Sequence, residues 1–347
     1  MALAEREAGR LQARRGLMIS GLRAPTPLAL AGLAAVMLAA SLALSDPFYL
    51  VAVSDLMTWI GLAAALNIIM GFAGYVSFGH VVFMGIGGYA TLYLMEYLAP
   101  GLADRSPLAA ALTGMLLGAA VAAALAASVG AAVLRLRGAF FAIATIGLDL
   151  AVLYLAQMLP TEEGGGEIYL SGAHKPSLRT VVLLTWAVFA LTLAAMVLVR
   201  KSRLGMGLEA IREDEDAAEA LGVPTFRYKT IAFTLSAALT ALMGGVYAWR
   251  TMSVTPGEAF NLVYSIRMIV IDVIGGLGTL LGPVVGGAIY YILDLLLSTS
   301  QSLKDLTDIV MGLIAIAVVL FFPEGIIGRL RRSKLRLAGR PLFRLLE

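Results

Sequence analysis

The chain has 347 residues, of which 60% are hydrophobic and 14% are charged, and its formal net charge at pH 7 is +3. A soluble domain of this size needs far more polar residues to cover its surface, so a soluble enzyme or binding module is excluded. The chain has no cysteine and only two histidines, so we expect neither disulfides nor a metal site built from these residues.

Ten apolar segments follow one another along the chain, and several exceed about 18 residues, enough to cross a hydrocarbon core about 30 Å thick as a helix. Lipid requires every backbone polar group to be paired, and the ten-residue alternation typical of a membrane barrel is missing. We therefore expect an all-α, polytopic membrane protein with about eight to ten spans, at roughly 28–45, 49–70, 81–98, 107–134, 138–159, 180–199, 229–250, 262–275, 280–297 and 307–322.

Basic residues gather in three regions, and these indicate the orientation. They are an N-terminal arm (1–27), a central loop (200–228) and a tail (326–347). The positive-inside rule places all three in the cytoplasm, with the membrane domain at 28–325, and the acidic loop with Glu162, Glu163 and Glu167 falls outside. The tail follows an apolar helix, so it is typical of a topology anchor that meets anionic lipid rather than of nucleic-acid binding. The first apolar run exceeds a usual signal-peptide core, which favours an uncleaved span.

Two glycine-rich stretches resemble each other, and each follows an apolar segment. They predict broken or re-entrant helices near 71–80 and 265–283, arranged as a parallel repeat of the kind from which transporters are often built. Chance similarity of glycine-rich turns is an equal alternative, and close helix packing is the expected role of most glycines. The glycines assigned to the breaks are Gly71, Gly74, Gly79, Gly275, Gly276, Gly278 and Gly282.

Polar side chains inside apolar segments are candidates for the transport pathway, because intramembrane charge is expensive and by default faces a cavity or a partner. A structural hydrogen bond between helices is the alternative for Asp149. Ser77 and His80 suggest an intramembrane hydrolase, but a polar turn that satisfies freed backbone groups is strongly favoured. The candidates are Asn67, Ser77, His80, Asp149, Arg267 and Asp272.

The central loop carries six carboxylates between Glu209 and Glu219, so it lies outside lipid. Its apolar residues recur at helical spacing, and Gly222 followed by Pro224 is a typical helix stop. We expect one amphipathic helix from Gly205 to Leu221, whose apolar stripe near the stop inserts into a partner's groove. The chain has no phosphate-binding G-x-x-x-x-G-K-[ST] loop, so if ATP drives the protein, another chain hydrolyses it.

Five stretches, in order along residues 50–328, resemble the permease subunits of branched-chain amino-acid ABC importers. They are Leu66–His80, Arg137–Gly147, Ala210–Phe233, Gly275–Pro283 and Phe322–Gly325. The Arg-Gly-x-x-Phe-Ala-Ile-Ala-Thr stretch is similar to the M type of subunit rather than the H type.

The resemblance implies a type II importer in a bacterial inner membrane, with both ends of this chain cytoplasmic. Its partners would be a second homologous permease, two ATPase subunits that bind ATP and Mg, and a periplasmic or lipid-tethered binding protein; the chain itself would be no enzyme and hold no cofactor. The cargo would be branched-chain or related amphipathic amino acids. The residues implied in ATPase coupling are Arg212, Glu213, Asp214, Ala217, Ala218, Glu219, Ala220, Leu221, Gly222 and Val223.

The chain departs from the family pattern at several positions that bear on cargo. Arg267 stands where an acid is usual, Asp272 where an apolar residue is usual, and residues 161–167 and Asp149-Leu150 also differ. A permease for urea or short amides is therefore one alternative. A self-sufficient, ion-coupled transporter working through Asp149, Asp272 and Arg267 is the other.

Overall fold

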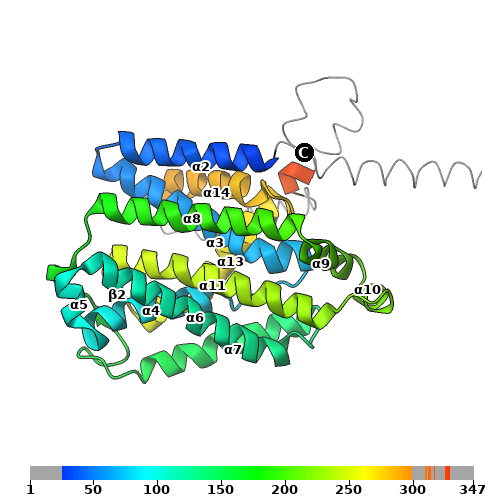
Figure 1. Cartoon of the computed structure of the whole chain (residues 1–347), viewed down its shortest axis with the longest axis horizontal. Coiled ribbons are helices and arrows are strands. Elements are labelled where there is room, and N and C mark those ends of the chain that lie inside the picture. Colours follow the sequence, from blue (N-terminus) through cyan, green and yellow to red (C-terminus); the bar gives the residue numbers. More distant parts are fainter. Residues whose placement is uncertain (1–25, 299–308, 311, 314–315, 317–324, 329–347) are drawn as a thin grey trace, which may run out of the picture.

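The computed structural model describes residues 26–298, 309–310, 312–313, 316 and 325–328 (Figure 1). Residues 1–25 of the basic arm, most of the tenth apolar segment and the tail after residue 328 lie outside the described residues. The elements are α2 (Thr26–Ala43), α3 (Pro47–Ala73), α4 (His80–Tyr93), the π-helix η2 (Leu94–Leu98), α5 (Pro100–Arg105), α6 (Pro107–Val133), α7 (Ala139–Gln157), β1 (Ile168–Tyr169), the 3-10 helix η3 (Gly172–His174), α8 (Leu178–Lys201), α9 (Arg203–Glu213), α10 (Glu215–Ala220), α11 (Thr225–Thr251), β2 (Ser253–Val254), α12 (Pro256–Ala259), α13 (Leu262–Gly275) and α14 (Gly282–Ser298).

Membrane-length helices dominate the described part of the chain, as predicted. Seven are long and apolar enough to span a bilayer: α2, α3, α4 with η2, α6, α7, α8 and α11. The predicted segments at 262–275 and 280–297 form the shorter helices α13 and α14, of 14 and 17 residues. The all-α, polytopic prediction is thus confirmed.

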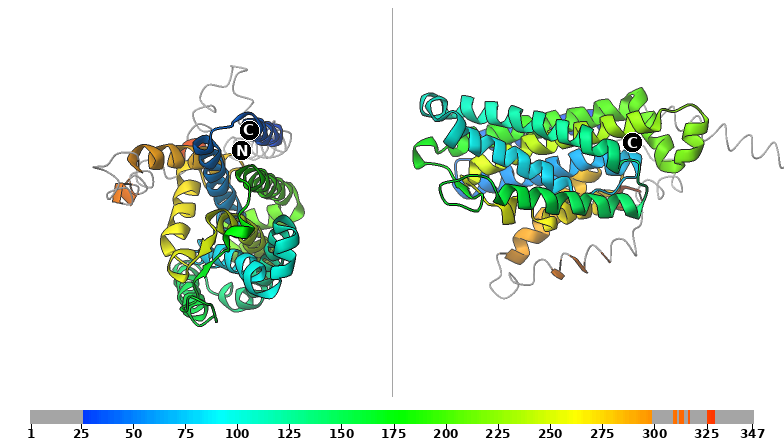
Figure 2. Two further views of the ribbon diagram at one scale, coloured as in Figure 1. Left: turned by 90° about the vertical axis from the view of Figure 1, so that its left-hand side faces the viewer. Right: turned by 90° about the horizontal axis from the view of Figure 1, so that it is seen from below.

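Helix α3 lies at the centre of the bundle, and its side chains are buried without interruption from Met57 to Ala73. It packs against α8, α11, α13 and α14, and the last two form one flank of the molecule (Figure 2). Glycines allow backbone-to-backbone packing elsewhere: a Cβ added to Gly87 of α4 would lie 1.8 Å from the Ala241 carbonyl oxygen of α11. The expected packing role of such glycines is confirmed there.

The two ends of the bundle differ. Helices α9 and α10 project at one end, whereas α5 and the small β1–β2 pairing lie at the other (Figure 1). The predicted acidic outer loop, with Glu162, Glu163 and Glu167, immediately precedes β1 and so lies at the end opposite α10. This arrangement agrees with the expectation that the basic and acidic loops occupy opposite sides.

Both predicted helix breaks are present, although each is shorter than expected. The first spans residues 74–79, after α3 ends at a left-handed Gly74 (φ 79°). The second spans residues 276–281, where Gly276 and Gly278 have φ of 120° and 75°. Glycine adopts these positive angles without the steric cost that a Cβ imposes, which explains its presence at these turns.

Candidate functional site: a coupling face at one end of the bundle

The charged loop forms two helices, so the prediction of one helix from Gly205 to Leu221 is wrong. Asp214 is extended (φ −162°, ψ 111°), and its carboxylate accepts a hydrogen bond from the Ala217 N–H at 3.0 Å. Aspartate is among the preferred N-cap residues because it satisfies a free N–H at the start of a helix. The capping bond therefore ends α9 and starts α10 at a new angle.

The predicted apolar stripe is also divided. Ala218 is only 2% exposed and belongs to the protein's own core, whereas Leu221 is 86% exposed beside a left-handed Gly222 (φ 85°). Val223 is half-buried. The expectation that Ala218, Leu221 and Val223 all enter a partner's groove is therefore wrong, since only Leu221 is fully presented to a partner.

Arg212, near the end of α9, joins that helix to both breaks. Its Nη1 donates to the Gly71 carbonyl at 2.6 Å and to the Leu277 carbonyl at 3.4 Å. The Gly71 carbonyl belongs to the last turn of α3, where a helix leaves acceptors unpaired and favours a positive charge, and the Leu277 carbonyl lies in the second break, just after α13 ends. One guanidinium thus links α9 to the end of α3 and to the second break.

Asn67 of α3, a predicted pathway residue, fastens that helix to the second break. Its amide donates to the Thr279 carbonyl at 3.0 Å and accepts from the Gly278 N–H at 3.0 Å. A Cβ on Gly71 would lie 1.8 Å from the Asn67 Oδ1, so glycine is required beside it. The two similar glycine stretches therefore meet in space.

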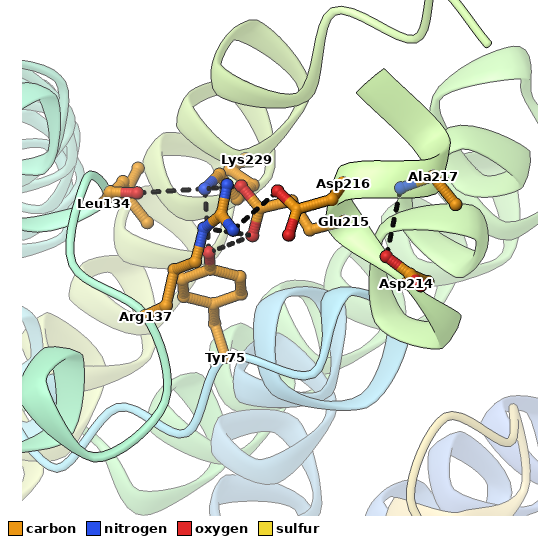
Figure 3. Close-up of polar contacts among 8 residues, drawn as sticks. All are labelled: Tyr75, Leu134, Arg137, Asp214, Glu215, Asp216, Ala217 and Lys229. Carbon is orange, nitrogen blue, oxygen red and sulfur yellow. Dashed lines mark hydrogen bonds and ion pairs between the residues drawn. The ribbon is translucent and has the colours of Figure 1, made fainter. Parts of the chain in front are cut away.

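A second polar cluster fixes the start of α10, and we call Tyr75, Arg137, Glu215 and Lys229 the coupling cluster (Figure 3). Lys229 of α11 lies 2.6 Å from the Glu215 carboxylate and donates to the Tyr75 hydroxyl at 2.8 Å. It also donates to the Leu134 carbonyl at the end of α6, at 2.9 Å. Tyr75 donates to Glu215 at 2.5 Å, and the Arg137 Nε lies 3.7 Å from the same carboxylate.

The electrostatics explain why these partners converge. Lys229 is only 3% exposed, and a buried ammonium group must be paired because removal of its hydration is costly. Burial, and then the hydrogen bond to Glu215, raise the pKa of Tyr75, so that the phenol remains a donor. The hydrogen bond to Asp216, and then the Glu215 charge, raise the pKa of the exposed Arg137.

The coupling cluster ties α10 to the break after α3, to the end of α6, to the loop before α7 and to the start of α11 (Figure 3). None of its four members was predicted from the sequence as a site residue. The available signal was Lys229, a lone cation near the start of an apolar helix, which requires a partner carboxylate. Nothing in the spacing identified Glu215 as that carboxylate.

Ser77 and His80 do not pair with each other. The His80 Nε2 lies 2.6 Å from the Ser236 Oγ, which itself donates to the Ala65 carbonyl at 2.5 Å. Ser77 is buried, and its hydroxyl has no hydrogen-bond partner within the described part of the chain. The contact between nucleophile and base that a serine hydrolase needs is therefore not formed among the described residues.

Side chains of other helices accept hydrogen bonds from the backbone N–H groups that are left unpaired at the first break. Thr145 of α7 accepts from the Phe78 N–H at 3.1 Å, and Ser265 of α13 accepts from the Val81 N–H at 3.0 Å. The expectation that Ser77 and His80 fulfil this role is wrong. The polar turn is real, but its partners come from distant helices.

The charged pathway candidates lie within α7 and α13. Asp149 of α7 and Asp272 of α13 are buried, and Asp149 Oδ1 and both Asp272 oxygens lack a hydrogen-bond partner among the described residues. Arg267 lies 3.9 Å from Asp294 of α14. Its ion-pair partner is thus a residue of the next helix, consistent with the poor spacing of Arg267 and Asp272 for a direct pair.

A bundle of membrane-length helices, with two joined glycine breaks and a projecting helix fixed to both, defines a multi-pass membrane permease. Residues 48–319 match the family model described as branched-chain amino acid transport system, permease component, and the chain belongs to this family of transport subunits, which are not enzymes.

Two kinds of relative represent the two kinds of permease subunit. The permease protein LivM of Salmonella typhimurium is 28% identical over 304 residues, covering 78% of this chain and 68% of LivM. LivH of the same organism is 26% identical over 285 residues, covering 78% of this chain and 92% of LivH. The similarity to the M type is thus confirmed, and the two relatives indicate a permease pair.

A permease named for a different cargo is also similar. The autoinducer 2 import system permease LsrC of Klebsiella pneumoniae is 28% identical over 222 residues, covering 59% of this chain and 63% of LsrC. No solved structure matches the chain.

Proposed function

We propose that this chain is one permease of a pair in an ATP-driven importer for branched-chain or related amphipathic amino acids. Two ATPase subunits that hold ATP and Mg power the pair, and a binding protein delivers the cargo. The names of LivM and LivH support the cargo, and the family supports the mechanism. The absence of a phosphate-binding loop from the sequence is consistent with hydrolysis in partner chains.

The observation that carries the proposal is the way in which α10 is attached to the bundle. Leu221, 86% exposed, stands beyond the end of α10, while Glu215 at its start is fixed to three other parts of the bundle through Tyr75, Arg137 and Lys229. An apolar side chain on a short helix suits insertion into a groove of an ATPase. A fixed base lets movement at the tip reach the membrane helices rather than dissipate in a loose loop.

The route from α10 to the passage follows the polar contacts. Lys229 leads into α11, Tyr75 into the first break, and Arg212 of the adjoining α9 into both breaks. ATP-driven closure of the ATPases would thus tilt α3, α4, α13 and α14 together. We further propose that the α9–α10 end and both chain ends face the cytoplasm of a bacterial inner membrane, which the positive-inside rule supports.

To test the proposal, the permease pair is reconstituted with its ATPases in proteoliposomes. The binding protein and labelled L-leucine are supplied on the side of the membrane opposite the ATPases. We expect uptake with ATP at the ATPase side and none with a non-hydrolysable analogue. Leucine uptake by this chain alone, driven by a proton or sodium gradient, would instead establish the ion-coupled alternative. Uptake of urea but not leucine would establish the amide alternative.

A further inference from the structure

A charged cavity opens between α3, α11, α13 and α14, towards the end of the bundle opposite α10. Its volume is about 360 Å³, within the range of roughly 300–1,000 Å³ typical of small-molecule sites. Two arginines and two aspartates line it, so the set carries both signs of charge in equal number. The charged lining residues are Asp55, Arg250, Arg267 and Asp294.

The four charged side chains form two ion pairs that differ in distance. Arg250 of α11 lies 2.5 Å from Asp55 of α3, whereas Arg267 of α13 lies 3.9 Å from Asp294 of α14. The Arg250 Nη1 and the Arg267 Nε are buried and have no hydrogen-bond partner among the described residues. Buried guanidinium donors without a partner are costly, so the described residues leave part of the hydrogen-bonding capacity of each arginine unused.

Aromatic rings supply the remaining surface. Trp59, Tyr247, Tyr264 and Tyr291 all line the cavity. The Arg267 guanidinium lies over the Trp59 ring, 4.7 Å from its centroid, and this stacking holds the cation in place. Rings that also hold cations offer apolar area to an aliphatic side chain.

We propose that this cavity binds the zwitterionic head of a free amino acid with a neutral side chain, an inference that rests on the proposed function. The ligand carboxylate meets the guanidinium groups of Arg250 and Arg267 that line the cavity, and planar guanidinium groups are well suited to carboxylates. The ligand ammonium meets Asp55 and Asp294, and the side chain lies against the aromatic rings. A molecule with only one of the two charges interacts with either the arginines or the aspartates and loses the other set of charge-assisted contacts.

The wild-type complex tests this without any substitution. Labelled L-leucine is bound to the permease–ATPase complex in nanodiscs, without nucleotide and without the binding protein, and displaced by unlabelled competitors. We expect isoamylamine, which lacks the carboxylate, and 4-methylpentanoate, which lacks the ammonium, to compete roughly tenfold or more weakly than L-leucine, because each loses charge-assisted hydrogen bonds. Equal competition by either analogue would overturn the zwitterion site.

A paired variant locates the binding. Asp55→Asn combined with Arg250→Gln keeps two polar side chains but removes both charges, and we expect leucine affinity to fall about tenfold or more. Arg179→Gln, at an exposed position at the start of α8, is the matched loss of a cation outside the cavity and should leave affinity unchanged. Unchanged affinity in the double variant would place any leucine site elsewhere and overturn the inference.

ATP-driven uptake by the wild-type importer separates the two proposals. Uptake with the binding protein but no detectable binding in its absence overturns the cavity site alone. Leucine binding with the expected competitor order, but no ATP dependence of uptake, overturns the ATP-driven assignment alone.

Discussion

At the α10 end, Lys229 lies 2.6 Å from Glu215, and Tyr75 bonds to both, so that charge is surrounded by partners. In the charged cavity, Arg267 and Asp294 are 3.9 Å apart, and the Arg267 Nε has no partner among the described residues. Both places bury charge among helices. The contrast teaches that completely paired charges suit a contact that transmits movement between helices. Incompletely paired charges leave hydrogen-bonding capacity for a ligand.

The largest expected effect comes from disrupting the coupling cluster. Lys229→Met removes the buried cation and leaves Glu215 and the Leu134 carbonyl without it, which should lower the free energy of unfolding by about 3–5 kcal/mol. Arg267→Met in the cavity should cost roughly 1 kcal/mol, because it loses only a long ion pair and ring stacking. Thermal unfolding of the purified permease pair measures both, and equal losses would remove the contrast.

The second prediction concerns transmission rather than stability. Arg212→Gln should retain assembly but weaken the hold on both breaks, at a cost of about 1.5–3 kcal/mol for charge-assisted bonds. Substrate-stimulated ATP hydrolysis should therefore fall roughly tenfold or more. Arg203→Gln, an exposed change at the start of the same helix, is the control. Normal stimulation in the Arg212 variant would show that α9 does not transmit movement to the breaks.

The smallest effect tests whether the bundle between the two ends is rigid. Gly87→Ala places a Cβ 1.8 Å from the Ala241 carbonyl oxygen, and such overpacking should cost about 1–3 kcal/mol. Gly101→Ala in α5, where no atom lies within 4 Å of the added carbon, should cost nothing. Thermal unfolding of the two variants compares them directly, and equal midpoints would indicate that α4 and α11 can readily separate.

The sequence was sufficient for the bundle and for the position of its breaks, because long apolar runs and clustered glycines have few other uses in lipid. The break at Asp214 was not foreseen, since an acidic residue within a charged run reads equally as helix interior or as N-cap. The partners of Lys229 and Arg267 were missed for another reason. Both pairings, with Glu215 and Asp294, depend on how separate helices meet, which residue spacing does not encode.

The central claim is that α10 is where an ATPase engages the permease, and Leu221 tests it most directly. Its exposure allows Leu221→Asp to change the tip without changing the core, while Leu221→Met preserves its apolar character. We expect the aspartate variant to fold normally but lose substrate-stimulated ATP hydrolysis in the reconstituted importer, and the methionine variant to retain it. Full stimulation in a normally folded Leu221→Asp importer would contradict the account.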